Sequence, residues 1–528
     1  FPYTPLFRSP VALRSQPAAA FGPAVAQLVA SATMKRPFLL TLLLGLLCAC
    51  TLSTPSAPTD LPPPPPSAPT LTTSPADLPP PATSLPPGNK HQRLSPQALH
   101  YLGAFRLPGG EDRPQTFAYG GNAMTFNPQG DRNGAADGFS GSLFISGHDR
   151  MPYGELPDGG QIAEVTIPAP VRARAVADLP QASFVQDFHN VLSGHFVRLD
   201  EIPRLGLLYL DVPQTGPQIH VAYGQHFETD PPSATHGWFS PNLAAPHFAG
   251  EWSLADTSFY SSNDYLLAIP AEWAATFTHG SMIGTGRFRD GGWSGIGPAL
   301  FAYRPWDENG QPPPNGATLP AIALLHYDSS LEGEDFSRAL AGYQHPDEWS
   351  GGAWVQTAAG QQALLFVGSK SNGEKYWYGY LNPQGAQAVC VDRNIQDFPT
   401  CRMADGSLCP PEDLSGCCDE VAGNCASLRG WWSNRFDAQI LFYDTDDLAR
   451  VATGEWQPWQ PQPYAHLDID ETLFLNAPEG ERISVGWGEQ RRYRIGAVAF
   501  DAQHARLYIL ELFADGAKPV VHVWQITE

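Results

Sequence analysis

The sequence has little positive charge. It holds 31 Lys and Arg against 53 Asp and Glu, which gives a formal net charge of −22 at pH 7. Such an acidic surface repels phosphate backbones, so we expect no nucleic-acid partner. The chain also has no apolar run near the 20 or so residues that a membrane-spanning helix needs. No stretch is therefore predicted to cross a bilayer as a helix.

The short motifs that mark well-known catalytic sites are also missing. No G-x-S-x-G, P-loop, S-x-x-K or H-E-x-x-H pattern occurs, so nothing indicates a serine hydrolase, a P-loop NTPase or a zincin. With 50 Gly and 53 Pro, turns are frequent and long helices are not expected. Short helices are predicted only near Pro270–Phe277 and Thr445–Thr453, the second capped by the acidic Asp444 cluster.

The N-terminal part has the order of a secretory signal. No Met precedes Met34, and we expect residues 1–33 to lie upstream of the true start. Lys35 and Arg36 form a short positive segment, and an apolar run to Leu47 follows. The run ends in Leu47-Cys48-Ala49-Cys50, which resembles the lipobox of bacterial lipoproteins.

This resemblance implies that residues 34–49 are a removable signal peptide and that a diacylglyceryl group is attached to Cys50. Thr51, in place of Asp, favours the outer membrane in a Gram-negative cell. Residues 50–90 follow as a Pro-rich stalk, with 14 Pro between 51 and 88, which should be extended and polyproline-like. We therefore expect an exported protein of the cell envelope, held to a membrane by its lipid.

Six of the eight cysteines gather in an insertion at residues 390–427. An even number of clustered cysteines in an exported chain predicts disulfides, and fifteen pairings are open. A zinc knot is the weaker alternative, because no C-x-x-C pair and no His occur in the window. The six are Cys390, Cys401, Cys409, Cys417, Cys418 and Cys425.

Residues 91–528 are predicted to be all-β. A recurring unit starts with Gly and a small residue, as at Gly121, Gly352 and Gly496, and more weakly at Gly297, and continues into short apolar strands. The pattern resembles the blades of an irregular β-propeller, with the Gly-rich segment innermost, where backbones converge. At 40–50 residues per repeat, we expect six to eight blades. Leu102–Leu107 should pair with Val520–Ile526 to close the ring. A β-sandwich or a pair of barrels is the alternative fold.

Several polar groups are candidates for chemistry. His148 and Asp149 follow an apolar strand directly and could act as an acid–base pair or bind a metal. Asp187 and His189 should share one strand face, and His220 is a further candidate. Asp131, Asn133 and Asp137 resemble part of a calcium loop, although the bidentate Glu of such loops is absent. In each case, turn capping or ordinary burial is the alternative interpretation.

Two functions follow as hypotheses. The first is a surface propeller that binds a glycan or a protein partner without catalysis. The second is a secreted hydrolase or lyase that uses His148 and Asp149 with a histidine from 189–236. The phrases at Tyr119–Gly121, Gly147–Asp149 and Lys518–Trp524 resemble an uncharacterised family of exported bacterial proteins, and this resemblance implies no activity. We favour binding, since no motif of known chemistry is present.

Overall fold

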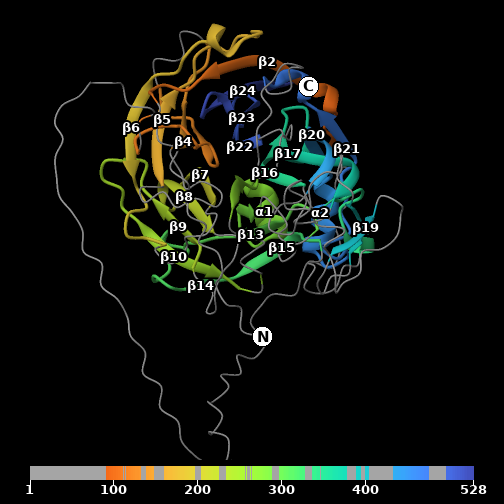
Figure 1. Ribbon diagram of the computed structural model, residues 1–528. Coiled ribbons are helices and arrows are strands. Elements are labelled where there is room, and N and C mark those ends of the chain that lie inside the picture. Colours follow the sequence, from red (N-terminus) through yellow and green to blue (C-terminus); the bar gives the residue numbers. More distant parts are fainter. Residues whose placement is uncertain are drawn as a thin grey trace, which may run out of the picture. The chain divides into compact units, whose positions relative to one another are not determined.

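The computed structural model describes residues 91–527 (Figure 1) apart from several gaps. The gaps are residues 111, 113, 132–137, 148–159, 197–203, 225–233, 256, 258–261, 263, 288–295, 328–335, 345–346, 377–387, 394–398, 404–431, 475–494 and 528. Predictions about the signal, Cys50 and the stalk therefore fall outside the described residues.

The strands form five sheets of four or five strands each. The first sheet contains β3 (Met124–Asn127), β4 (Ser142–Ser146), β5 (Gln161–Thr166) and β6 (Phe184–Asn190). The second contains β7 (Arg204–Val212), β8 (Gly216–Gly224), β9 (His236–Phe239), β10 (Ala249–Leu254) and β14 (Thr318–Leu319). The third contains β11 (Tyr265–Ala268), β12 (Ile283–Gly286), β13 (Leu300–Tyr303) and β15 (Ala321–Leu325).

The last two sheets involve both ends of the described chain. The fourth contains β16 (Glu348–Gln356), β17 (Gln361–Tyr376), β20 (Trp432–Tyr443), β21 (Ala465–Asp468) and the short N-terminal β1 (Gln92–Arg93). The fifth contains β22 (Ile495–Asp501), β23 (Arg506–Asp515), β24 (Lys518–Ile526) and β2 (Leu99–Arg106). A separate hairpin joins β18 (Ala388–Arg393) to β19 (Pro399–Met403).

The five sheets are arranged as the blades of a β-propeller (Figure 1). The first strand of each sheet contacts the first strand of the next, in the cyclic order β3, β7, β11, β16, β22 and back to β3. Five separate apolar cores lie between neighbouring sheets, one for each pair. The all-β propeller prediction is confirmed in its architecture.

Burial on both faces explains why several strands are continuously apolar. The side chains of β4, Ser142–Ser146, are all buried, because this strand contributes to the cores on both sides of its sheet. Close approach at the axis also requires glycine. A Cβ on Gly206 of β7 would overlap the carbonyl oxygen of Asp264, at the start of the neighbouring inner strand.

The expected six to eight blades are not confirmed, since the described residues form five sheets. Each blade uses more chain than a compact repeat because long connections separate its strands. The weaker Gly297 copy also differs from its expected place, because it leads into β13, the third strand of its sheet. The inner strand there is β11, and the strands of the second sheet have no Gly-small opening that the sequence pattern could detect.

Ring closure follows the prediction. Strand β2 pairs antiparallel with β24, from Leu99 opposite Ile526 to Arg106 opposite Val520. A buried polar chain links the three outer strands of this sheet. The carboxylate of Glu511 lies 2.8 Å from His522 Nε2, and His522 Nδ1 lies 2.9 Å from the hydroxyl of Tyr101 on β2. The N-terminal strand is thus attached to the last blade by both backbone and side-chain bonds.

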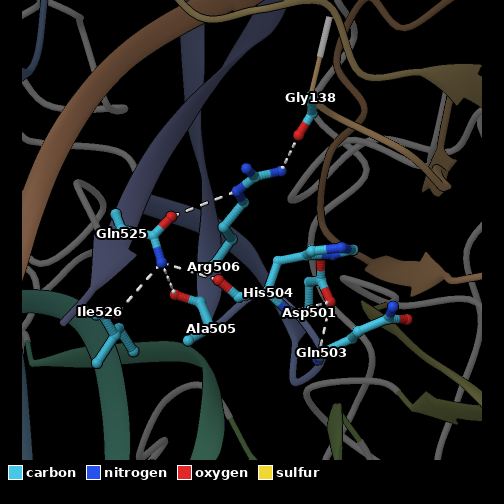
Figure 2. Close-up of polar contacts among 8 residues, drawn as sticks. All are labelled: Gly138, Asp501, Gln503, His504, Ala505, Arg506, Gln525 and Ile526. Atoms are coloured by element: carbon cyan, nitrogen blue, oxygen red, sulfur yellow. Dashed lines mark hydrogen bonds and ion pairs between the residues drawn. The ribbon is translucent and has the colours of Figure 1, made fainter. Parts of the chain in front are cut away.

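We call the end of the ring where the inner strands begin the entry end, and the opposite end the exit end. Figure 2 shows a turn at the exit end, between β22 and β23. The carboxylate of Asp501 accepts hydrogen bonds from the backbone of Gln503 and His504. Arg506 donates to Gly138 O at 2.7 Å, which ties the fifth sheet to the first. The turn is well bonded at this end.

The described helices are short, as expected. Helix α1 (Ala271–Phe277) and helix α2 (Thr445–Ala452) confirm both predicted positions. The side chain of Asp444 accepts a hydrogen bond from Asp446 N at 2.9 Å, which is the predicted cap. Four 3₁₀ turns are also described: η2 (Pro96–Ala98), η4 (Val176–Asp178), η7 (Phe336–Arg338) and η8 (Asp470–Thr472).

Candidate functional site

The entry end carries most of the long connections of the ring. Connections leave this end wherever the second strand of a sheet leads to the third, or the fourth leads to the next sheet. They span residues 107–123, 147–160, 191–203, 225–235, 255–264, 287–299, 326–347, 377–431 and 469–494, and the two-residue turn 516–517. At the exit end, three connections are tight turns, at 213–215, 357–360 and 502–505, and the longer ones lie at 128–141, 167–183, 240–248, 269–282, 304–317 and 444–464. Variable loops placed on a rigid scaffold are a common location for binding residues.

A small hollow lies at the axis of the ring, where the inner strands meet. Residues from all five inner strands or their starts line it, including Asn122, Gly206, Tyr265, Ser350 and Val498. The free space is about 10 Å³, which is room for about one water molecule. An organic ligand therefore has no room inside this hollow.

Two buried ion pairs lie where inner strands start at the entry end. Asp347 accepts from Lys370 Nζ at 3.0 Å and from Ser371 N at 2.8 Å. Asp264 and Arg287 lie 3.7 Å apart. Burial raises the pKa of the Asp347 carboxyl, and the Lys370 ammonium opposes this shift. Because the donors around Asp347 fix the backbone before β16 and within β17, we assign this pair a structural role.

Three of the sequence phrases meet at the entry end, between the fifth and first sheets. Tyr119 N donates to Ala517 O at 2.8 Å. A Cβ on Gly120 would overlap the carbonyl oxygen of Gly147, and a Cβ on Gly121 would touch Pro519. We call this junction the seam. His148 and Asp149 follow Gly147 in the chain but lie outside the described residues.

Two aromatic residues at the seam have left-handed backbones. Tyr119 has φ +62° and Phe513 has φ +61°. For a bulky side chain this conformation is unusual and costs about 1–2 kcal/mol. The two rings contact each other edge to face, with centroids 6.0 Å apart. Both are only partly buried. Strain of this kind is often found where a binding site holds side chains in place.

Sequence reasoning did not name Phe513, and it named Tyr119 only within the phrase Tyr119–Gly121, without a role. Tyr119 precedes a Gly-Gly pair, which is a weak signal for a strained turn. Nothing in the sequence around Phe513 indicates a positive φ, because the register shift between Glu511 and Asp515 that accompanies it appears only in the paired strands.

The predicted catalytic residues do not share one described site. Asp187 and His189 lie on β6, the outermost strand of the first sheet, where Asp187 is exposed and accepts a hydrogen bond from Phe188 N at 2.8 Å. His220 lies on β8 and packs in the core between the second and third sheets. A catalytic role for these residues remains a prediction.

His220 is fully buried, and neither ring nitrogen has a hydrogen-bond partner. Its ring packs edge to face on Trp238, with centroids 5.3 Å apart, and near Trp306. Burial lowers the pKa of His220 to about 3 and that of His236 to about 3. His236 differs because Thr235 and Thr285 lie within hydrogen-bond distance of its ring. Both imidazoles are therefore neutral at physiological pH.

The metal candidates are only partly described. Asp131 lies in the exit-end connection between β3 and β4, and Asn133 and Asp137 lie outside the described residues. Within the described ranges, no group of three or more His, Cys, Asp or Glu side chains could hold a metal ion. Calcium binding at this loop stays a prediction.

The cysteine insertion is described only at its first hairpin. Cys390 on β18 and Cys401 on β19 are register partners, and their side chains lie outside the part of the protein that the structure describes. Cys409, Cys417, Cys418 and Cys425 fall outside the described residues. The disulfides therefore remain predictions.

The fold places the chain in the class of β-propeller proteins, here with five blades in the described residues. No family model and no curated protein matches the chain. Among the described helices, none has the length and apolar character needed to cross a membrane. The argument about function therefore depends on the geometry of the ring.

Proposed function

We propose that this protein is an exported lipoprotein whose propeller binds a glycan or protein partner of the cell envelope at its entry end. The proposal is supported by the contrast between the small hollow at the axis of the ring and the long connections at its entry end. The hollow at its axis has room for about one water, and most of its long connections leave from one end. A rigid scaffold with most of its long connections at one end suits recognition of a large ligand.

The binding proposal is tested by remodelling one end at a time. Residues 377–431 are replaced by a short Gly-Ser turn between β17 and β20, and exposed residues of the exit-end segment 308–313 are replaced by Ala as the matched control. Purified protein is immobilised and exposed to solubilised cell-envelope material. We expect loss of captured material only with the entry-end variant. Equal capture by both variants would contradict the proposal, provided that both retain the thermal unfolding midpoint of the unmodified protein.

The anchor is tested separately with Cys50→Ala. Its thiol is the proposed lipid attachment point, and it lies in sequence well before the first described strand. We expect the variant to fold and to move from the membrane fraction to the soluble fraction after cell lysis. A Cys48→Ala variant is the control and should stay with membranes, because Cys48 would be removed with the signal. Membrane association of Cys50→Ala equal to that of the unmodified chain would rule out the anchor.

A further inference from the structure

Tyr119 and Phe513 share three properties. Both have left-handed backbones, both rings are partly exposed, and they contact each other at an interplanar angle of 68°. Asn or Gly would occupy either backbone position with less strain. Neither ring belongs to any of the five apolar cores between the sheets. Packing in a core therefore does not offset the strain.

Other aromatic side chains show what a purely structural role looks like. Phe196 also has a left-handed backbone, at φ +52°, but it is 4% exposed and packs in the core between the first and second sheets. Burial of that ring compensates for its backbone. The comparison indicates that Tyr119 and Phe513 have a role at the surface.

The seam holds the two rings firmly. The backbone of Tyr119 is bonded to Ala517, and Gly120 N donates to Phe117 O at 2.9 Å. Gly121 O accepts from Ala497 N of the inner strand β22 at 3.0 Å. Phe513 follows Leu512, which is 8% exposed and packs against Gly121. The backbone that carries Tyr119 is thus held in place before any ligand arrives, which lowers the entropy lost on binding.

We propose that Tyr119 and Phe513 form an aromatic platform for a neutral oligosaccharide. This inference builds on the proposed function and names its ligand class. A sugar ring presents an apolar C–H face that stacks on an aromatic ring, and its hydroxyl groups bond to polar neighbours. The net charge of −22 disfavours anionic polymers. A protein anchor would need a broad apolar surround, whereas the sequence neighbours of the two rings are the buried Ala118 and Leu512 and the small Gly120 and Ala514.

The test uses the purified full chain and a panel of uncharged hexasaccharides: cellohexaose, maltohexaose, laminarihexaose, xylohexaose, mannohexaose and chitohexaose. Calorimetry measures the dissociation constant for each. We expect at least one to bind, and Tyr119→Asn and Phe513→Asn each to weaken it at least tenfold. Because Asn suits the left-handed backbone, the thermal unfolding midpoint should stay unchanged or rise by roughly 1–2 °C.

Matched variants separate stacking from folding. Tyr119→Phe and Phe513→Tyr keep the ring faces and should bind within about threefold of the unmodified chain. Phe196→Asn removes a buried ring and should lower the unfolding midpoint without changing the dissociation constant. If the Asn variants bind normally, or lose binding only with a fall in midpoint like that of Phe196→Asn, the platform is overturned.

A further test of the platform uses only the unmodified chain. Saturation-transfer NMR with irradiation of aromatic protons should transfer signal to the C–H protons of the bound sugar, and absence of transfer would overturn the platform. Failure of every hexasaccharide to bind at 10 mM would also overturn the platform. Capture of envelope material at the entry end is a separate readout. The proposed function can therefore survive when the platform fails, and a protein partner would then be indicated.

Discussion

At the scale of single residues, this propeller buries two histidine side chains completely, His220 and His236. His220 has two ring nitrogens without partners inside an aromatic core, and His236 is equally buried. In the unfolded chain each imidazole takes up a proton near pH 6.5. In the fold, burial delays protonation to about pH 3.

These two histidines predict loss of stability in acid. Between pH 6.5 and 3 the unfolded state binds more protons than the fold, so the free energy of unfolding rises with pH across this window. Each histidine should account for about 2 kcal/mol between pH 8 and pH 5. Urea unfolding at a series of pH values measures the slope. His220→Leu should reduce the slope. An unchanged slope in His220→Leu would contradict the assignment.

The seam gives a second prediction at this scale. A Cβ added to Gly120 would overlap the carbonyl oxygen of Gly147, so Gly120→Ala requires the backbone to move. We expect a loss of about 1–3 kcal/mol in the free energy of unfolding. Gly110→Ala is the matched control, because a Cβ there meets nothing within 4 Å, and it should be neutral or slightly stabilising. Similar midpoints for the two variants in chemical unfolding would show that the seam is not tightly packed.

At the scale of elements, strand register decides what the sequence left open. The cysteine spacing allows fifteen pairings, but β18 and β19 place Cys390 opposite Cys401. Residues directly opposite in an antiparallel pair have Cα atoms about 4.5–5.5 Å apart, which suits a disulfide.

We therefore predict a Cys390–Cys401 disulfide. Trypsin cuts after Lys375, Arg393, Arg402 and Arg429, so the two cysteines fall in separate peptides, each without another cysteine. Mass spectrometry of an unreduced digest should show peptides 376–393 and 394–402 joined. A reduced digest is the control and should release them. Linkage of either peptide to 403–429 would refute this pairing.

At the scale of the whole molecule, one strand decides whether the ring closes. Strand β2 comes from the N-terminal end, immediately after the proposed stalk, and completes the last blade beside β24. It also contributes Ala104 and Phe105, which are fully buried. Without β2, the edge of β24 and the core between the fifth and first sheets would be exposed to solvent.

Two truncations test this closure. A chain of residues 91–528 retains β2, and we expect it to unfold in a single cooperative transition. A chain of residues 108–528 lacks β2 and should aggregate or show no cooperative transition. Tyr101→Phe in the longer chain removes only the hydroxyl beside His522 and should cost about 1 kcal/mol. Cooperative unfolding of the shorter chain would show that closure does not depend on β2.

The sequence by itself determined the local features. Alternating and continuous apolar runs indicated the strands, and Asp444 indicated the start of α2, because these signals depend on neighbours in the chain. Ring closure was also predicted, because an apolar strand pattern at each end of the chain needs a partner strand. Only the tertiary structure decided the number of blades, the burial of His220 and the strained pair of Tyr119 and Phe513. These features depend on contacts between segments that are far apart in sequence. Long connections obscure the repeat, and the local sequence pattern does not indicate which distant residues a side chain will contact.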